Sequence, residues 1–412
     1  MIKKHLQKSI INRKLCICKN KLKEKIDFGN LPLINNYQSE KNLKKYPVII
    51  SQCEECLLIQ LKYSVPDKLL FPKNYSYLSG NSKEKLNNFI SILNKIKRLT
   101  RKSNPKILDI GSNDGSFLEL AKKDFSKVLG VEPTDTANLS IKKGINTIKI
   151  PLNIKLAKKI VNKHSNFDFI VATNFFAQTN HLVEILNSVK IILNKDGFLI
   201  VEVQYLYDVL NQKGFDSFHH EHIAYYTASS IKKLLNKFNL YVFDAERLKV
   251  HGGILRVYIS LKNKPITKNL QKILNSENDK NTISRVKNLN LFRINFSNKL
   301  KKVLVNLRKK NKKVYAMGAA PRACVMLNSC KLSKNEIGLV GEVPQSLKCK
   351  KYVPGTDIMV QNENRIISDK PDYVIILAWH LKKIITNLLL KKGYKGNFII
   401  PLPKLKIIKK GN

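Results

Sequence analysis

Long apolar runs are missing from this sequence of 412 residues. The longest, such as Tyr373 to Trp379, are far shorter than the roughly 20 residues that cross a bilayer as a helix. The opening stretch MIKKHLQKSIINRK also lacks the apolar region that a secretory signal requires. We therefore expect a soluble, cytoplasmic protein with no membrane partner. Its 43% of hydrophobic residues is ample for a buried core.

Acidic residues are scarce: 30 Asp and Glu stand against 75 Lys and Arg, which gives a formal charge of +45. Such a balance raises nucleic acid or an anionic membrane surface as partners. The basic residues are, however, spread along the whole chain, and the dense segments (41–45 and 309–313) are short. Short charge runs are usually solvated faces, so we predict no nucleic-acid partner. A polyanionic small substrate would still suit such a surface.

Cysteine is infrequent, with seven in the chain, but four of them fall in the first 75 residues. Their pattern is Cys16-x-Cys18 and Cys53-x-x-Cys56. In a cytosolic chain such cysteines favour metal binding or free thiols over disulfides. Four thiolates from two short turns can hold a structural, tetrahedral Zn²⁺. Because C-x-C is not the usual spacing of a zinc knuckle, a site with one missing ligand and a set of buried free cysteines are the alternatives.

Strand-like and helix-like segments alternate after residue 100. The strand-like runs of the middle region are residues 106–110, 127–133, 167–173 and 197–203. Four more follow near the end of the chain: KVYAM, IGLVGE, PDYVIILAW and GNFIIPL. This alternation predicts parallel sheets covered by helices on both faces. We expect an α/β protein with a small N-terminal module (1–75), a middle domain (76–245) and a C-terminal α/β domain (246–412).

The run ILDIGSNDGSFLEL predicts a strand, a turn and the start of a helix. The dinucleotide fingerprint G-x-G-x-x-G is absent, and the run instead contains Asp109, Gly111, Asn113 and Gly115. The next strand ends in Glu132, where a carboxylate suits a ribose diol. This order is typical of S-adenosylmethionine sites in Rossmann-like methyltransferases. The alternative is an ordinary strand–helix–strand turn with Glu132 on a solvated loop.

Two further candidate residues follow predicted strands. Asn174 comes after the strand at 167–173, where methyltransferases often contact the methionine end of the donor. A simple turn asparagine is the alternative. Arg322 lies in the turn GAAPRA after the strand VYAM, a turn that could face a phosphate with Arg322 as its counter-charge.

The run FDSFHHEHIAYY places three of the eight histidines of the chain within four positions, 219 to 222. It comes after the last predicted parallel strand of the middle domain. Histidine titrates near neutral pH and is the natural general base of an enzyme. The cluster is therefore a candidate catalytic site, and a structural turn of satisfied histidines is the alternative.

Nearly the full length of the chain resembles the deoxysugar C-methyltransferase family, which acts on nucleotide-linked keto-sugars. DFGNLPLINNY and YPVIISQCEECLLIQL resemble its zinc-binding domain, and LDIGSNDGSFLEL and LGVEP resemble its S-adenosylmethionine domain. KVHGGILRVYI, YAMGAAPRACVMLN, KKYVPGTDI and PDYVIILAW resemble its C-terminal domain, and FDSFHHEHIAYY falls on its catalytic signature. The resemblance implies S-adenosylmethionine as donor, structural Zn²⁺ and a nucleotide-linked sugar substrate that the C-terminal domain helps to hold.

The resemblance also implies roles for single residues. His222 matches the base that removes a proton next to the ketone, and Glu221 matches an acid that orients the substrate or the base. His219 stands where the family has a tyrosine and could donate to the enolate oxygen. Tyr77, together with Tyr75, matches an aromatic position near the substrate pocket, with core packing as the alternative.

Two rival functions are open on the sequence alone. A nucleic-acid methyltransferase would suit the positive charge and the zinc module. Base N-methylases often carry an Asn/Asp-Pro-Pro-aromatic run after a central strand, however, and that place reads ATNFFAQ here. A non-catalytic nucleotide-sugar-binding relative is the other rival, because Gln178 stands where the family usually has histidine.

Overall fold

The computed structural model describes residues 10–409 except 42, 74, 76, 101 and 278–280. Most of the segment used for the signal-peptide prediction therefore lies outside the described residues. The chain forms two compact units. The first takes in the chain up to Glu24, Ser51–Asp208 and Ile223–Asn281, and the second takes in Lys25–Ile50, Val209–His222 and the chain from Thr282 onward.

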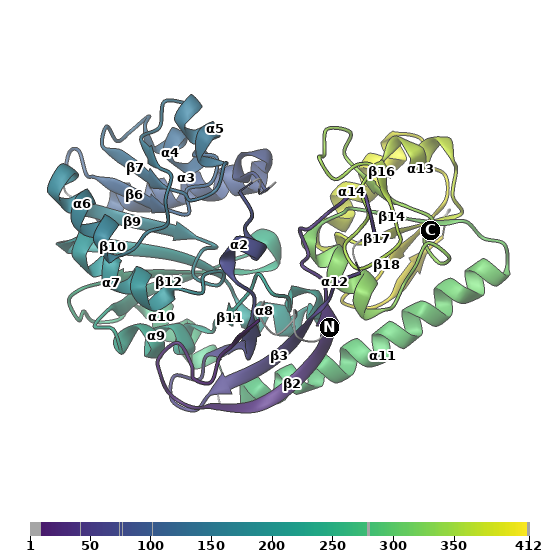
Figure 1. Cartoon of the computed structure of the whole chain (residues 1–412), viewed down its shortest axis with the longest axis horizontal. Coiled ribbons are helices and arrows are strands. Elements are labelled where there is room, and N and C mark those ends of the chain that lie inside the picture. Colours follow the sequence, from purple (N-terminus) through teal and green to yellow (C-terminus); the bar gives the residue numbers. More distant parts are fainter. Residues whose placement is uncertain are drawn as a thin grey trace. The chain divides into compact units, whose positions relative to one another are not determined.

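A seven-stranded sheet forms the centre of the first unit (Figure 1). Its strands, in spatial order, are β12 (Tyr241–Leu248), β13 (Ile254–Ser260), β10 (Leu193–Gln204), β9 (Phe167–Thr173), β6 (Ile107–Ile110), β7 (Val128–Val131) and β8 (Thr147–Ile148). The pairs from β10 to β8 are parallel, as predicted from the alternation. β13 runs antiparallel to both of its neighbours, and β12 was not predicted at all.

Helices cover both faces of this sheet. They are α3 (Lys83–Leu99), α4 (Ser116–Ala121), α5 (Ala137–Lys142), α6 (Ile154–His164), α7 (Leu182–Ile192), α9 (Ala228–Asn236) and α10 (Lys268–Ser276), and the same unit also contains the short helix α2 (Asp67–Leu70). Alternate residues of a strand point to opposite faces. Ile107 accordingly packs with α3 and α4, whereas Leu108 and Ile110 pack with α6 and α7. A strand that is buried on both faces explains the continuous apolar run in the sequence.

Short strands build the cysteine-rich part of the first unit. β1 (Ile11–Asn12) pairs with β5 (Tyr63–Ser64), and β4 (Ile59–Leu61) pairs with β11 (Ala224–Tyr225), both antiparallel. The chain leaves the first unit within β2 (Leu22–Leu31) and returns to it within β3 (Tyr46–Cys53). A second departure occurs within α8 (Leu206–Asn211).

The second unit contains its own six-stranded sheet (Figure 1). Its strands, in spatial order, are β16 (Val360–Asn362), β15 (Val340–Glu342), β14 (Val314–Met317), β17 (Tyr373–Ile376), β18 (Asn397–Ile400) and β19 (Lys406–Ile408). Its helices are α11 (Thr282–Lys309), α12 (Pro321–Ser329), α13 (Asn364–Ser368) and α14 (Lys382–Lys391). The four strands expected from the sequence are present, and β16 and β19 are additions of three residues each at the two edges.

The compact units do not follow the expected sequence boundaries one to one. The boundary expected between residues 245 and 246 falls inside β12, and the first unit continues to Asn281. β13 belongs to the sheet of the first unit through six residue pairs with β10. The histidine run up to His222 belongs to the second unit, and the chain rejoins the first unit at Ile223.

Candidate functional site

The predicted donor turn lies at the topological switch point of the first sheet. β6 has β7 on one side and β9 on the other, and such switch points are where ligands bind in open α/β sheets. Gly111 and Gly115 have positive φ angles of 72° and 74°. A Cβ atom at Gly115 would lie 2.3 Å from the hydroxyl of Ser140, and one at Gly111 would lie 3.0 Å from the ring of Phe175. Both glycines are therefore required by the backbone of this turn.

Glu132 lies directly after β7 and ties the strand end to the turn. Its Oε2 accepts a hydrogen bond from the backbone N–H of Asn113 at 3.0 Å. Its Oε1 accepts from the backbone N–H of Thr134 at 2.8 Å and from the Thr134 hydroxyl at 2.7 Å. The side chain is buried, so the alternative of a solvated loop is wrong. A carboxylate has about four acceptor positions, so at least one is left for a ligand hydroxyl.

Asp109 is buried at the carboxyl end of β6. Burial raises the pKa of this carboxyl well above its ordinary value, the Lys85 ammonium opposes that rise, and Glu132 adds to it. Lys85 lies in the first turn of α3 and is itself buried. No pattern in the sequence distinguishes this lysine from the many others.

The remaining predicted ligands of the first unit lie around the same strand ends. Asn174 follows β9 with a φ of 57°, and its backbone N–H donates to the Glu202 carbonyl at 2.8 Å. Its backbone conformation thus fits the turn alternative, and its side chain remains a proposed donor contact. The Tyr77 carbonyl accepts from the Asn113 side chain at 3.0 Å, which places Tyr77 beside the donor turn. The Tyr77 side chain is 46% exposed, and the ring of Tyr75 packs edge-on against Phe71.

The four N-terminal cysteines form one buried cluster. Their sulfur atoms all lie within 4.8 Å of one another, with Cys16 to Cys56 at 3.6 Å and Cys18 to Cys53 at 3.4 Å. A tetrahedral zinc ion bound at about 2.3 Å requires sulfur atoms roughly 3.8 Å apart. The cluster therefore fits Zn²⁺ with all four positions filled by protein, which is the arrangement of a structural site. The C-x-C spacing does not prevent this, because Cys16 and Cys18 each face one cysteine of the second knuckle.

The histidine run brings two imidazole rings together in the second unit. The ring centres of His219 and His222 are 4.2 Å apart, and the backbone N–H of His222 donates to the His219 carbonyl at 3.1 Å. Nδ1 of His222 lies 3.2 Å from the carbonyl oxygen of Ser217. A carbonyl only accepts, so Nδ1 carries the proton and Nε2 is the unprotonated nitrogen. His220 makes different contacts, with the Pro47 carbonyl at 3.3 Å.

His219 and His220 are buried, His222 is half-buried, and all three are held in their neutral form. Burial lowers the pKa of His222 to about 4, opposed by the hydrogen bond to Ser217 and reinforced by Arg322. Burial lowers the pKa of His220 to about 4 as well, and it lowers the pKa of His219 well below the ordinary value. At neutral pH His222 is thus an unprotonated imidazole that can accept a proton.

Glu221 is held by a partner that the sequence did not reveal. Both of its oxygens accept from the side-chain amide of Asn35, at 2.8 and 3.0 Å. Asn35 lies in the run LINNY, which carries part of the resemblance, but nothing in the pattern links it to a residue 186 positions away. The amide fixes the orientation of the Glu221 carboxylate beside the histidine pair.

Arg322 lies against the turn that precedes the histidines. Its guanidinium contacts the Ser217 hydroxyl, and its Nε is 3.7 Å from a carboxylate oxygen of Asp216. Asp216 is fully buried and also accepts from the indole N–H of Trp379 at 2.7 Å. Arg322 and Trp379 thus hold the turn whose carbonyl sets the tautomer of His222. Nη1 of Arg322 is buried without a hydrogen-bond partner among the described residues, so the predicted phosphate contact stays a proposal.

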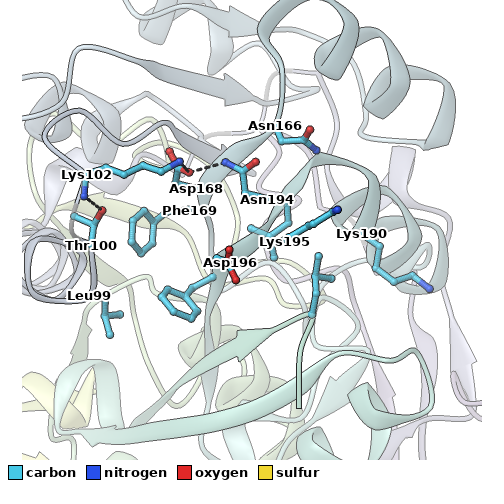
Figure 2. A pocket seen from close by; sticks show the side chains of 13 residues that line it. Leu99, Thr100, Lys102, Asn166, Asp168, Phe169, Lys190, Asn194, Lys195 and Asp196 are labelled. Carbon is cyan, nitrogen blue, oxygen red and sulfur yellow. Dashed lines mark hydrogen bonds and ion pairs between the residues drawn. The ribbon is translucent and has the colours of Figure 1, made fainter. Parts of the chain in front are cut away.

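A cavity of about 660 Å³ lies elsewhere in the first unit (Figure 2). It is lined by the starts of β9 and β10, and Lys102 and Asn194 both point to Asp168, each at 2.5 Å (Figure 2). Ligands of open α/β sheets bind at the opposite, carboxyl ends of the strands. None of the predicted site residues lines this cavity, and its buried carboxylate, Asp168, is already paired with Lys102 and Asn194.

Comparison with known proteins assigns all three parts of the chain. The matching family models are a zinc binding domain (residues 16–71), a methyltransferase domain (84–245) and a C-methyltransferase C-terminal domain (249–403). The chain is also 25% identical over 401 residues to the C-methyltransferase NovU of Streptomyces niveus, covering 93% of each chain. Together these matches identify an S-adenosylmethionine-dependent C-methyltransferase. The C-methyltransferase depends on S-adenosylmethionine and has the Rossmann-like donor domain and the four-cysteine zinc module expected from the sequence.

Solved structures resemble the donor domain of this C-methyltransferase only distantly. An S-adenosylmethionine-dependent methyltransferase from Clostridium acetobutylicum is 13% identical, covering 45% of this chain and 94% of that one, with a TM-score of 0.33. Magnesium protoporphyrin IX methyltransferase from Synechocystis, solved with bound S-adenosylhomocysteine, is 11% identical, covering 43% and 83%, with a TM-score of 0.34. No helix among the described residues of the C-methyltransferase is both long and apolar enough to cross a membrane.

Proposed function

We propose that the enzyme methylates a carbon next to the ketone of a nucleotide-linked keto-deoxysugar, through an enolate. The single observation that carries this proposal is the state of His222: a neutral imidazole whose Nδ1 faces the Ser217 carbonyl, so that Nε2 is the unprotonated nitrogen. A sugar carbon is not a nucleophile until a neighbouring ketone allows its proton to be removed. A C-methyltransferase of such a substrate needs a base of this kind. A cytoplasmic location is part of the same proposal.

Proton removal is the step that the histidine pair would perform. Nε2 of His222 takes the α-proton, and the electron pair of the broken C–H bond forms the enolate. Proton uptake makes His222 a cation, which the Ser217 carbonyl stabilises through Nδ1–H. His219, with its ring centre 4.2 Å away, supplies an N–H for the enolate oxygen in place of the family's tyrosine. Glu221, oriented by Asn35, accepts from a hydroxyl of the sugar.

The donor end of the reaction belongs to the first unit. Bound S-adenosylmethionine supplies an electrophilic methyl group. Glu132 would accept from its ribose, while Gly111, Asn113 and Gly115 let the turn approach it closely. Asp109 and Asn174 would face the methionine end. Tyr77 and Tyr75 remain proposed substrate contacts next to this turn.

The nucleotide would be held by the second unit, whose sheet also has a glycine turn at a switch point. β14 has β15 and β17 on its two sides, so the turn at Gly318 lies at a switch point. Glu342 ends β15 and accepts from the backbone N–H of Ala319 at 2.9 Å. A glycine turn followed by an acid at the next strand tip suits a ribose, and Arg322 Nη1 would serve a phosphate.

Solvent exchange tests the base without needing the methyl step. We would incubate a nucleotide-linked 4-keto-6-deoxysugar with enzyme and S-adenosylhomocysteine in D₂O and follow the α-proton by NMR. The wild type is expected to exchange it, and His222→Ala is expected to lose at least about 100-fold in rate because general-base catalysis is removed. Binding of S-adenosylhomocysteine should not change in this variant.

The control for this experiment is His181→Ala, which removes a largely exposed histidine of the first unit. It should exchange at the wild-type rate. Exchange by His222→Ala at the wild-type rate would refute the assignment of His222 as the base. An absence of exchange with every keto-sugar tried, in a wild type that binds the donor product, would contradict the proposed substrate class.

A further inference from the structure

Lys85 is a buried cation without an acceptor. Its side chain is 2% exposed, in the first turn of α3. Among the described residues its ammonium makes no hydrogen bond or ion pair. The ammonium lies over the ring of Phe89, 5.3 Å from the ring centre. Burying a charge without a partner is unfavourable. A group that is missing from the free protein would remove this cost.

Asp109 is the matching acidic group. It is 3% exposed at the end of β6, and no described residue donates to its carboxylate. Asp109 raises the pKa of Lys85, and Lys85 lowers the pKa of Asp109, yet the two groups do not form an ion pair with each other. Two such groups, buried at the start of α3 and at the end of β6 and each without a partner of opposite charge in contact, suit a ligand that carries one charge of each sign.

The other charges around Lys85 are already paired. The Glu202 carboxylate accepts twice from the Asn88 amide, at 2.9 and 2.8 Å, and once from Nε of Arg256 at 2.9 Å. Arg256 also donates to the Asn88 side-chain oxygen at 2.8 Å. Glu202 and Arg256 thus form a closed pair. Within this buried group, only Lys85 and Asp109 lack partners.

The backbone before Lys85 is attached to the donor turn. The N–H of Ser79 donates to the Asn113 side chain at 2.9 Å, and the N–H of Gly80 donates to Asp114 at 3.0 Å. Ser82 then caps α3 by accepting from the N–H of Lys85 at 3.3 Å. The start of α3 is therefore anchored on the turn that follows β6.

We propose that Lys85 and Asp109 together bind the amino-acid end of S-adenosylmethionine, with the Lys85 ammonium on its α-carboxylate and the Asp109 carboxylate on its α-ammonium. Binding then gives each of the four charges a partner of opposite sign. The proposal rests on the proposed placement of the donor at the turn after β6. It adds a residue that the sequence did not suggest, and it gives Asp109 a defined partner atom.

The test compares two ligands that differ only in the α-carboxylate: S-adenosylhomocysteine and S-adenosyl-3-thiopropylamine. Their Kd values would be measured by calorimetry on the full-length, zinc-loaded protein. Lys85→Met should weaken binding of S-adenosylhomocysteine about tenfold or more, the size of a lost hydrogen bond between charged groups, and leave the amine analogue unchanged. Asp109→Asn should weaken both ligands. Lys85→Arg should restore part of the loss.

Lys83→Met is the matched control, because Lys83 is an exposed lysine in the same helix turn. It should bind both ligands like the wild type. Equal weakening of both ligands by Lys85→Met would indicate a structural lysine and overturn the inference, as would no weakening at all. The readout is separate from the sugar: a wild type that shows the expected selectivity but methylates no keto-sugar would refute the substrate and leave the lysine assignment standing.

Discussion

At the residue scale, the proposed chemistry depends on which nitrogen of His222 is unprotonated. The Ser217 carbonyl fixes the proton on Nδ1, and Arg322 and Trp379 hold the turn that presents this carbonyl. Removing a residue of this second layer should change the orientation of the base without removing it. The neutral state of the histidines has a further consequence for stability.

The stability of the second unit should fall in mild acid. His222 and His220 titrate near 4 in the folded chain and near 6.5 when unfolded. As the pH falls from 6.5 to 4, the unfolded chain takes up protons that the folded chain refuses. Each histidine therefore lowers the free energy of unfolding by about 1.4 kcal/mol per pH unit. Over the whole range, each histidine lowers it by about 3 kcal/mol.

The comparison of wild type with His222→Gln isolates this effect from the buried carboxyls, whose pKa values are raised. The advantage in unfolding free energy of the wild type over the variant, from urea titrations at pH 7, 6, 5 and 4, should shrink by about 3 kcal/mol across the series. A difference that stays constant with pH would show that the fold does not hold His222 in its neutral form. His181→Gln, an exposed change, should show no such trend.

At the element scale, both units use a strand, a glycine turn and a helix at a switch point. β6 with Gly111 and Gly115 does so in the first unit, and β14 with Gly318 does so in the second. The cysteine module uses a different device: two tight turns that need a metal to hold them together. Short strands such as β1 and β5 bury little apolar surface, so this module depends on the ion.

The zinc content of the purified protein should therefore be measurable and should depend on the four cysteines. We expect one Zn²⁺ per chain by inductively coupled plasma mass spectrometry. Cys53→Ser should lose it, with zinc affinity reduced more than about 100-fold, and should melt at a lower temperature because the module loses its cross-link. Cys349→Ser, which changes a half-buried cysteine outside the cluster, should retain the metal. Full zinc content in Cys53→Ser would contradict the four-cysteine site.

At the scale of the whole molecule, patterns within short runs could be predicted and pairings across the chain could not. The cysteine knuckles, the glycine turn and the histidine run are each visible in a few consecutive residues. Asn35 and Trp379 act on partners 186 and 163 positions away, and no local pattern announces them. Lys85 is one of 75 basic residues, and only its burial distinguishes it.

The limits of prediction for the fold have the same origin. The apolar run ILRVYIS is typical of a buried strand, and it forms β13. Its composition does not indicate the direction of the strand, which is antiparallel to β10. β16 and β19 have three residues each and are too short to show a period. The net charge of +45 likewise does not predict where a site lies, because the lysines are spread along the whole chain.

The most direct measurement follows the methyl group itself. Purified protein would receive methyl-labelled S-adenosylmethionine together with mixed nucleotide-linked 4-keto-6-deoxysugars in one reaction and total RNA in another. We expect the label on a sugar carbon, in a position next to the ketone, and none above background on RNA. Label on RNA with none on the sugars would contradict the proposed function.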